Sequence, residues 1–242
     1  MVTKNLLFRH LIVALLALLL TLPFWFGRLE WDPEMRLWRA IGDGSFMLLF
    51  FTLAIGAVAK LWSPAARLVS WRRETGIWYG LLAFIHTLLI FSGWARWDWM
   101  RFLGYEFIPE LGRIARMEPG FGLSNLVGLV AIVLTVALVA TSSNWAINFL
   151  GASAWKWLQY GSYTVFYLVV LHTIYFLFMH YTISFHRIPP NEPNWFRYPF
   201  LLLAVIIPLL QASAFIKTVA RRAAAGQPKI RNRKHDLNAP VA

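Results

Sequence analysis

The chain has 242 residues, of which 59% are hydrophobic and only 14% are charged, and its formal net charge is +12. Soluble globular domains carry about 25% charged residues, so this composition is typical of a membrane protein. The basic residues lie beside apolar runs, which indicates signals for membrane topology and argues against nucleic-acid binding. The sequence has no cysteine, which excludes iron–sulfur ligation, disulfides and thiol chemistry.

Six apolar runs are candidates to cross a hydrocarbon core about 30 Å thick. A backbone in lipid must satisfy its own hydrogen bonds, so each run predicts a helix. The predicted fold class is all-α, a polytopic six-helix transmembrane bundle over residues 1–216, followed by a basic tail over 217–242. The predicted spans are residues 11–26, 44–61, 77–94, 121–141, 163–183 and 198–215. No small-x-small cleavage pattern follows the first run, so we expect it to remain as a span.

Lysine and arginine counts predict the orientation. The N-terminus, the loops at 60–76 and 142–162, and the tail together hold 14 basic residues and two acids. The opposite loops hold 9 basic residues and 9 acids. We therefore expect a bacterial inner-membrane protein with both termini in the cytoplasm and a basic tail that contacts anionic lipid. The connection at 95–120 is expected to be an outer-face loop with an interfacial helix.

Histidines within the spans are the candidates for chemistry, because an ionisable residue inside a membrane is costly. His86 and His172 each lie nine residues into a span, and both spans run from inside to outside. At 1.5 Å per residue, each imidazole lies roughly 13 Å above the inner boundary. Two imidazoles matched in depth suit a bis-histidine heme, provided that each ring's other N–H has a partner. Ordinary hydrogen bonding across a helix interface is the alternative.

Other polar and small residues could support such a site. His180 lies eight residues after His172, about 12 Å nearer the outer surface, and is either a fallback iron ligand or a hydrogen-bonding residue at the outer rim. Arg96 and Arg187, on the outer side, could hold heme propionates, as could Arg72 and Arg73 on the inner side. A small-xxx-small pair, Gly76 and Gly80, could allow close approach of a helix or a porphyrin.

Two segments carry a resemblance to a known family. The residues at 72–78, Arg-Arg-Glu-Thr-Gly-Ile-Trp, followed by His86, resemble the third helix of ferric-reductase-like transmembrane domains, with the heme-binding MsrQ (YedZ) branch as the closest. The residues at 155–160, Trp-Lys-Trp-Leu-Gln-Tyr, with His172 thirteen residues after Gln159, are similar to the fifth helix of that family. The resemblance covers about residues 40–215.

The resemblance implies that His86 and His172 bind one heme b. It further implies electron transfer from quinol or a cytoplasmic flavin donor toward a periplasmic redox partner, with quinone or FMN as a further cofactor. Gln159 stands where the family commonly has a second histidine, so no inner heme is expected. Asp43 replaces a basic residue of the family. The sequence contains no GxGxxG fingerprint, so the reductant must come from a partner or from the quinone pool. The alternative to an electron-transfer subunit of an oxidoreductase is a non-catalytic accessory or scaffold subunit.

Overall fold

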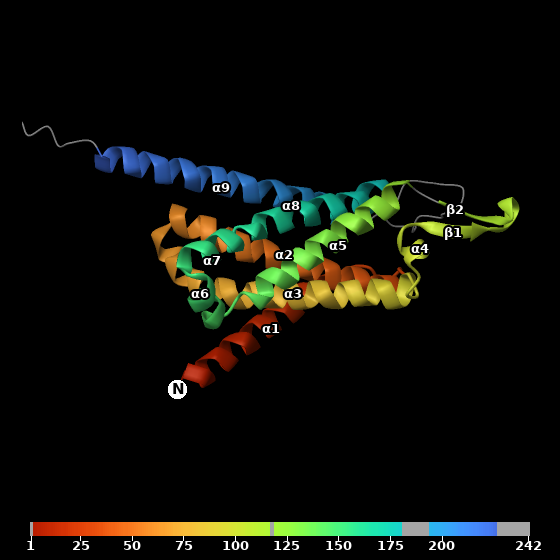
Figure 1. Ribbon diagram of the computed structural model, residues 1–242, viewed down its shortest axis with the longest axis horizontal. Coiled ribbons are helices and arrows are strands. Elements are labelled where there is room, and N and C mark those ends of the chain that lie inside the picture. The colour runs from red at the N-terminus through yellow and green to blue at the C-terminus, as the bar shows by residue number, and fades with distance from the viewer. Residues whose placement is uncertain (1, 117–118, 181–193, 227–242) are drawn as a thin grey trace, which may run out of the picture.

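The computed structural model describes residues 2–116, 119–180 and 194–226, and most of these form long helices that pack side by side (Figure 1). Six helical segments are long and apolar enough to cross a membrane, which confirms the predicted all-α transmembrane bundle. The long helices are α1 (Val2–Phe26), α2 (Pro33–Leu61), α3 (Arg72–Leu89), α5 (Pro119–Ala140), α8 (Gly161–Ile174) and α9 (Arg197–Gly226). Short helices are α4 (Trp99–Phe102), α6 (Asn144–Leu150) and α7 (Ala152–Gln159), and Ser63–Trp71 forms a 3₁₀-helix between α2 and α3.

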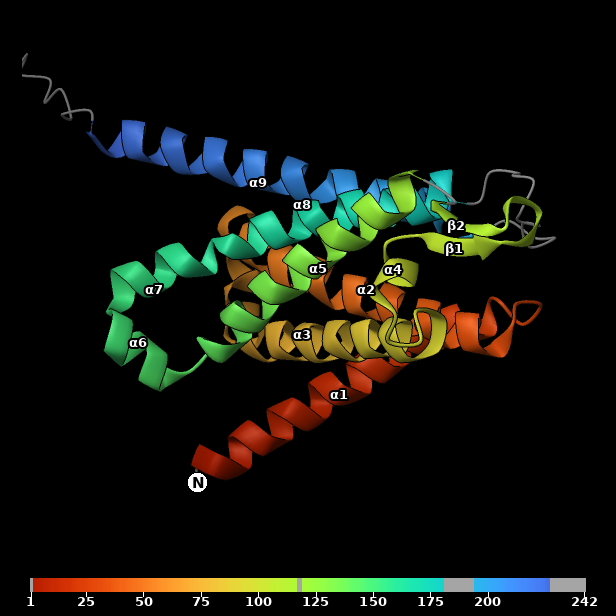
Figure 2. The same ribbon diagram turned by 45° about the vertical axis from the view of Figure 1, so that its right-hand side comes forward.

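The bundle has two distinct ends. The start of α1 and the end of α9 both lie at one of them, on opposite sides of the bundle, and we name it the tail end (Figures 1 and 2). A small antiparallel hairpin, β1 (Tyr105–Ile108) and β2 (Arg113–Arg116), projects from the opposite end, which we name the hairpin end. The shared position of the two helix ends agrees with an even number of crossings. The assignment of the tail end to the cytoplasm stays a prediction.

The hairpin corrects the expectation of an interfacial helix at 95–120. The helical pieces between the third and fourth spans are short: the four residues of α4 and a 3₁₀-turn at Pro109–Leu111. Asp98 caps α4 by accepting hydrogen bonds from the backbone of Met100 and Arg101. The chain then turns at Gly112, whose φ of +58° is a conformation that glycine adopts readily. Phe107 pairs with Ile114 across the strands, so alternating side chains there support a sheet.

The central helix is α2, which contacts α1, α3, α8 and α9. Its buried face carries Leu48, Leu49 and Leu53, each at most 1% exposed. Phe46 on the same helix packs against Phe200 of α9, with ring centroids 4.6 Å apart. Many large apolar side chains on the outer helices are instead exposed, as expected of surfaces that face lipid.

Helix α2 begins at Pro33, eleven residues before the predicted span. The prediction missed these first turns because charged residues interrupt their apolar pattern. Asp32 caps the helix and Pro33 follows at the first helical position. The buried carboxylate of Asp43 is neutralised by Arg28, 2.5 Å away, and Arg28 also donates to the Asn194 side chain at 2.9 Å. The fifth predicted span reached residue 183, but residues 181–183 lie outside the described part of the chain.

Helices α3 and α5 approach closely near the last turns of α5. A Cβ added at Gly80 would lie 2.6 Å from Cγ2 of Val139, whereas one at Gly76 would meet nothing nearer than 3.6 Å. One turn away, the Tyr79 hydroxyl and the Thr135 hydroxyl share a hydrogen bond of 3.0 Å. Of the predicted glycine pair, Gly80 is therefore the member that lets two helices meet.

Candidate functional site

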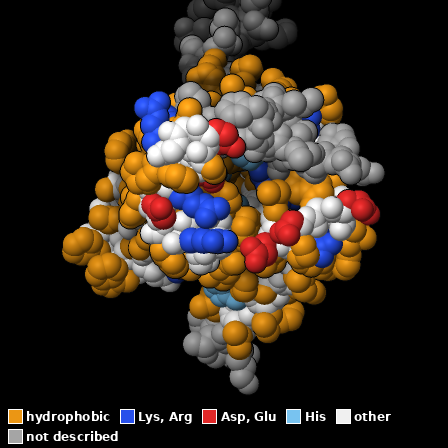
Figure 3. All heavy atoms as spheres, turned by 90° about the vertical axis from the view of Figure 1, so that its right-hand side faces the viewer, with side chains coloured by type: hydrophobic (Ala, Val, Ile, Leu, Met, Phe, Trp, Pro, Cys, Tyr) orange, Lys and Arg blue, Asp and Glu red, His pale blue; other side chains and the backbone are white. Residues whose placement is uncertain are grey.

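A large cavity opens between α2, α3, α5 and α8 in the half of the bundle nearer the hairpin end. It has an empty volume of about 1330 Å³, which includes its open mouth, and apolar side chains line most of it. Cofactor and ligand pockets are commonly lined by hydrophobic and aromatic side chains with a few polar groups, and this cavity has such a lining. His86 and His172 both line the cavity, as does His180. Figure 3 shows the hairpin end, where acidic and basic side chains gather among hydrophobic ones.

His86 reaches the cavity from α3 and is held by the backbone of α2. Its Nδ1–H donates to the carbonyl oxygen of Trp38 at 2.9 Å. The imidazole lies over Gly42, where an added Cβ would be only 3.0 Å from the ring. Because a carbonyl oxygen can only accept, this bond fixes the proton on Nδ1 and leaves the lone pair on Nε2.

His172 is held in the same way by a different pair of helices. Its Nδ1–H donates to the carbonyl oxygen of Ser124 on α5 at 2.8 Å. Its ring lies over Gly128, where an added Cβ would be 2.8 Å from Nδ1. The Ser124 hydroxyl in turn donates to the carbonyl oxygen of His172 at 3.1 Å, so the two residues fasten α5 to α8 reciprocally.

The two histidines therefore share one structural device: a carbonyl at position i of the neighbouring helix and a glycine at i+4. Side chains in a helix point toward its N-terminus, so any side chain at i+4 would lie over that carbonyl. Glycine leaves the carbonyl open to the imidazole. Within the described residues, neither Nε2 atom has a hydrogen-bond partner. Metal-binding histidines characteristically donate their other N–H to a carbonyl in this manner.

Each histidine is also followed by a π-helical turn. Residues Ile90–Trp94 form one at the end of α3, and residues Tyr175–Met179 form the other at the end of α8. Single π-turns occur frequently at functional sites, because they change which side chains face inward. Here Trp94 and His180, at or just after these turns, face the cavity.

The rim of the cavity differs from the prediction. Arg96 is exposed and is not among the cavity-lining residues, and Arg187 lies outside the described part of the chain. Arg39 lines the cavity instead, one turn of α2 nearer the hairpin end than Gly42, with its guanidinium 5.3 Å from the Phe176 ring. Arg36 and Arg39 stand one turn apart just before an apolar run, a pattern that could have indicated a basic residue at the mouth of the cavity.

Asp43 contributes the other charge in the cavity wall. Its ion pair with Arg28, which lies outside the cavity wall, compensates the charge of this carboxylate. The basic residue that the family resemblance leads one to expect at position 43 is thus replaced by a buried pair, which fastens the α1–α2 connection to α2.

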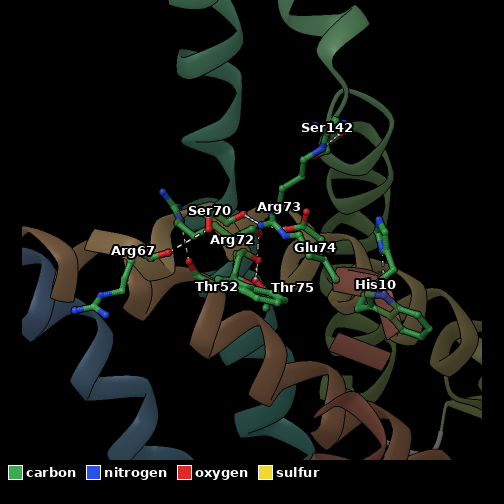
Figure 4. A network of polar contacts seen from close by, with 12 residues as sticks. His10, Thr52, Arg67, Ser70, Arg72, Arg73, Glu74, Thr75 and Ser142 are labelled. Atoms are coloured by element: carbon green, nitrogen blue, oxygen red, sulfur yellow. Dashed lines mark hydrogen bonds and ion pairs between the residues drawn. The ribbon is translucent and has the colours of Figure 1, made fainter. Parts of the chain in front are cut away.

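A second position of the same design lies nearer the tail end. Thr52 and Gly56 stand on α2 fourteen residues after Trp38 and Gly42. The carbonyl of Thr52 accepts a hydrogen bond from Arg72 Nε at 3.0 Å (Figure 4). A Cβ added at Gly56 would lie 3.1 Å from the guanidinium of Arg72. Arg72 precedes His86 on α3 by the same fourteen residues, or about four helical turns.

A related contact joins α5 to the end of α7, although Ser142 and not a glycine follows the accepting carbonyl by four residues. The carbonyl of Leu138, fourteen residues after Ser124, accepts a long hydrogen bond of 3.4 Å from Gln159 Nε2. Gln159 precedes His172 by thirteen residues. Arg72 and Gln159 therefore occupy the places that two further imidazoles would take, about 21 Å nearer the tail end. A guanidinium has no lone pair to donate and is always protonated, so this pair does not suit heme iron.

The residues of the hairpin-end cavity fit a heme. Two imidazoles present unprotonated nitrogens, the space between the helices is large and apolar, and a guanidinium stands at the mouth, where carboxylates could bind. His180 lines the same cavity with its ring 5.3 Å from Phe121 and Phe176. It is held by these aromatic rings and lies about two turns from His172.

No protein-family model matches the chain, but several known proteins are similar to it in sequence. The chain is 34% identical over 152 residues to the protein-methionine-sulfoxide reductase heme-binding subunit MsrQ of Bordetella pertussis, and 29% identical over 148 residues to that of Polaromonas naphthalenivorans. The matches cover 62% and 61% of this chain. The chain spans 66% of the length of the first relative and 61% of the second.

A second kind of relative is the magnetosome protein MamZ of Paramagnetospirillum magneticum, 31% identical over 136 residues, which are 56% of this chain and 19% of that protein. The relationship that the motifs around His86 and His172 predicted is therefore confirmed by sequence similarity to MsrQ subunits.

Gly128→Ala tests the support of His172. The new Cβ would lie 2.8 Å from Nδ1, so the imidazole must move away from the Ser124 carbonyl. Loss of such a supporting contact typically reduces metal affinity about 10–100-fold. We expect hemin titration of the purified variant to show that weakening. Gly161→Ala is the matched control, because its Cβ would meet Leu138 at an ordinary 3.7 Å. Equal affinity in both variants would contradict the proposed support.

Proposed function

We propose that this chain, which is similar in sequence to the heme-binding MsrQ subunits, holds one b-type heme and serves as a membrane electron-transfer subunit of an oxidoreductase. The observation that carries the proposal is the pair of imidazoles on one cavity, each with Nδ1–H bound to a helix carbonyl. When bound, heme supplies reversible one-electron chemistry at its iron.

In this proposal His86 and His172 are the axial ligands, presented through Nε2. The carbonyls of Trp38 and Ser124 fix each ring's orientation and keep the proton on Nδ1, and such bonds also raise the basicity of the ligand nitrogen. The apolar lining excludes water and gives a low local dielectric, which strengthens electrostatic interactions inside the cavity. His180 contributes hydrogen bonding at the rim and is the fallback ligand.

Arg39 is the proposed anchor for heme propionates in place of Arg96, and Arg187, outside the described residues, stays a prediction for the same role. It lines the cavity, and a guanidinium can bind a carboxylate through two parallel hydrogen bonds. Such charge-assisted bonds would orient the porphyrin edge toward the hairpin end. The cavity lies in that half of the bundle, so we propose that a redox partner protein docks at the hairpin end, which the positive-inside rule places in the periplasm.

Quinol is the proposed electron donor, and a cytoplasmic flavin is the second candidate. Arg72 and Gln159 stand where a second pair of imidazoles would be needed for an inner heme, so the proposed heme is separated from the tail end by about 21 Å along the helices. Electron tunnelling weakens steeply with distance. A quinol dissolved in the bilayer can approach the heme-binding half laterally, whereas a water-soluble flavin carrier cannot.

A non-catalytic accessory role is the alternative function. The replacement of the tail-end imidazole positions by Arg72 and Gln159 favours it, because those side chains now fasten helices together through carbonyls that could otherwise hold histidines. A chain in which the hairpin-end cavity had likewise lost its cofactor would serve as a structural subunit of a larger membrane complex.

Ligand substitutions separate the two functions. Purified wild-type protein is expected to give the reduced-minus-oxidised spectrum of a b-type cytochrome, with one heme per chain. His86→Ala and His172→Ala should each remove the low-spin spectrum, whereas His180→Ala should retain it. A colourless protein from heme-replete cells would support the accessory role. Loss of the spectrum in His180→Ala alone would show that the axial ligands are misassigned.

Arg39→Gln tests the charge at the cavity mouth. Removing a nearby positive charge disfavours the reduced heme, so the midpoint potential should fall while the low-spin spectrum remains. Arg36→Gln is the matched control, because Arg36 lies one turn away on α2 with its guanidinium 3.9 Å from the Trp25 ring and does not line the cavity. Redox titration compares the two variants. Equal changes in potential would exclude a specific role for Arg39.

The donor is tested in proteoliposomes that contain the purified heme-loaded chain. One preparation receives a reduced quinol, and the other receives NADH with a flavin reductase and FMN outside the vesicles. We expect heme reduction to be faster with quinol, measured by the change in heme absorbance. Faster reduction by the flavin system would assign the donor to the cytoplasmic side.

A further inference from the structure

A second cavity, unrelated to the histidines, lies at the tail end between the last residues of α2 and the last turns of α9. It is open to the surface, and its empty volume of about 540 Å³ includes solvent outside the lining residues. Four cationic residues line it, together with two small residues of α9. The lining residues are Lys60, Lys217, Thr218, Arg221, Arg222 and Ala225.

The spacing of these residues explains why they converge. Residues three and four apart share one face of a helix, so Lys217, Arg221 and Arg222 project from neighbouring positions on α9. Lys60 stands in the last turn of α2, which packs against α9. The Lys217 ammonium donates to the carbonyl of Leu61 at 2.5 Å, which satisfies one of the free carbonyls at the C-terminus of α2 and fixes the two helices together.

The positive charge of this cluster is not compensated by carboxylates in the described part of the chain. The ion pairs found there join Arg9 to Glu74, Arg28 to Asp43 and Arg101 to Glu106, and none involves the cluster. Four cations around one cavity repel one another, so an anion bound between them would relieve the repulsion. The chemistry that fits is a phosphate group, which accepts several charge-assisted hydrogen bonds from lysine and arginine.

We propose that this cavity binds the phosphate-bearing head group of an anionic phospholipid. The cavity lies at the end of two helices that are long and apolar enough to cross a membrane, α2 and α9, which is the level of the lipid head groups. Basic pockets between transmembrane helices at the cytoplasmic side are known to bind such head groups.

The position of α9 gives the bound lipid a structural role. The last part of α9 projects past the other helices at the tail end (Figure 2). The Lys217 contact with Leu61 and the shared cavity join it to α2 there. A lipid head group held by both helices would fasten the projecting segment to the bundle, independently of whether heme is bound.

The test uses the full-length purified chain in neutral phosphatidylcholine nanodiscs, with and without added phosphatidylglycerol. Native mass spectrometry should show retained phosphatidylglycerol on the wild-type chain, and the anionic lipid should raise its Tm. Arg221→Gln/Arg222→Gln should bind about 30-fold more weakly, since each basic residue near the surface contributes about 1 kcal/mol. Lys60→Gln alone should give about fivefold weaker binding by the same reasoning, which keeps the test decisive if the double variant does not fold.

The matched control is Arg67→Gln/Lys156→Gln, which removes two exposed positive charges from the same end of the bundle but outside the cavity. It should bind the lipid like the wild type. Equal weakening in the control would show that only general surface charge matters and would overturn the proposal. Stabilisation of the wild type by inorganic phosphate in neutral nanodiscs, to the extent given by phosphatidylglycerol, would overturn the lipid assignment in favour of a free phosphate.

Discussion

The site depends on one contact made twice: an imidazole N–H bound to a helix carbonyl that a glycine one turn later leaves open. His86 uses Trp38 and Gly42, and His172 uses Ser124 and Gly128. The contact fixes the ring's tautomer, its orientation and the distance between the helices at once. Since each histidine is held by a helix other than its own, the four helices around the cavity must be correctly packed before two nitrogens can face one space.

The same kind of contact also occurs in the tail-end half of the bundle, where the residues present do not suit heme iron. Arg72 with Thr52 and Gly56, and Gln159 with Leu138, repeat the arrangement about four turns away, but with side chains that bind carbonyls and not iron. Those residues still fasten α2 to α3 and α5 to α7. The scaffold has therefore kept its helix-joining function at the tail end, while the arrangement suited to iron is confined to the hairpin end.

Much of the fold could be predicted from the sequence, because six apolar runs and their flanking charges act locally. The depth match of His86 and His172 was also visible, since it needs only helix geometry. Three features could not be predicted, because they depend on which helices become neighbours. These are the carbonyl acceptors, the glycine beneath each ring and the position of Arg39. The β-hairpin was missed because each of its strands has only four residues. An alternation of apolar and polar side chains is hard to recognise over so short a stretch within a charged loop.

The central claim is that two imidazoles bind one iron in the cavity of the hairpin end. It is tested most directly by electron paramagnetic resonance and near-infrared magnetic circular dichroism of the oxidised, purified chain, together with heme quantification. The account predicts a single low-spin heme per chain with the signature of bis-imidazole ligation. Two distinct low-spin hemes, a high-spin heme, or ligation by a group other than imidazole would contradict it.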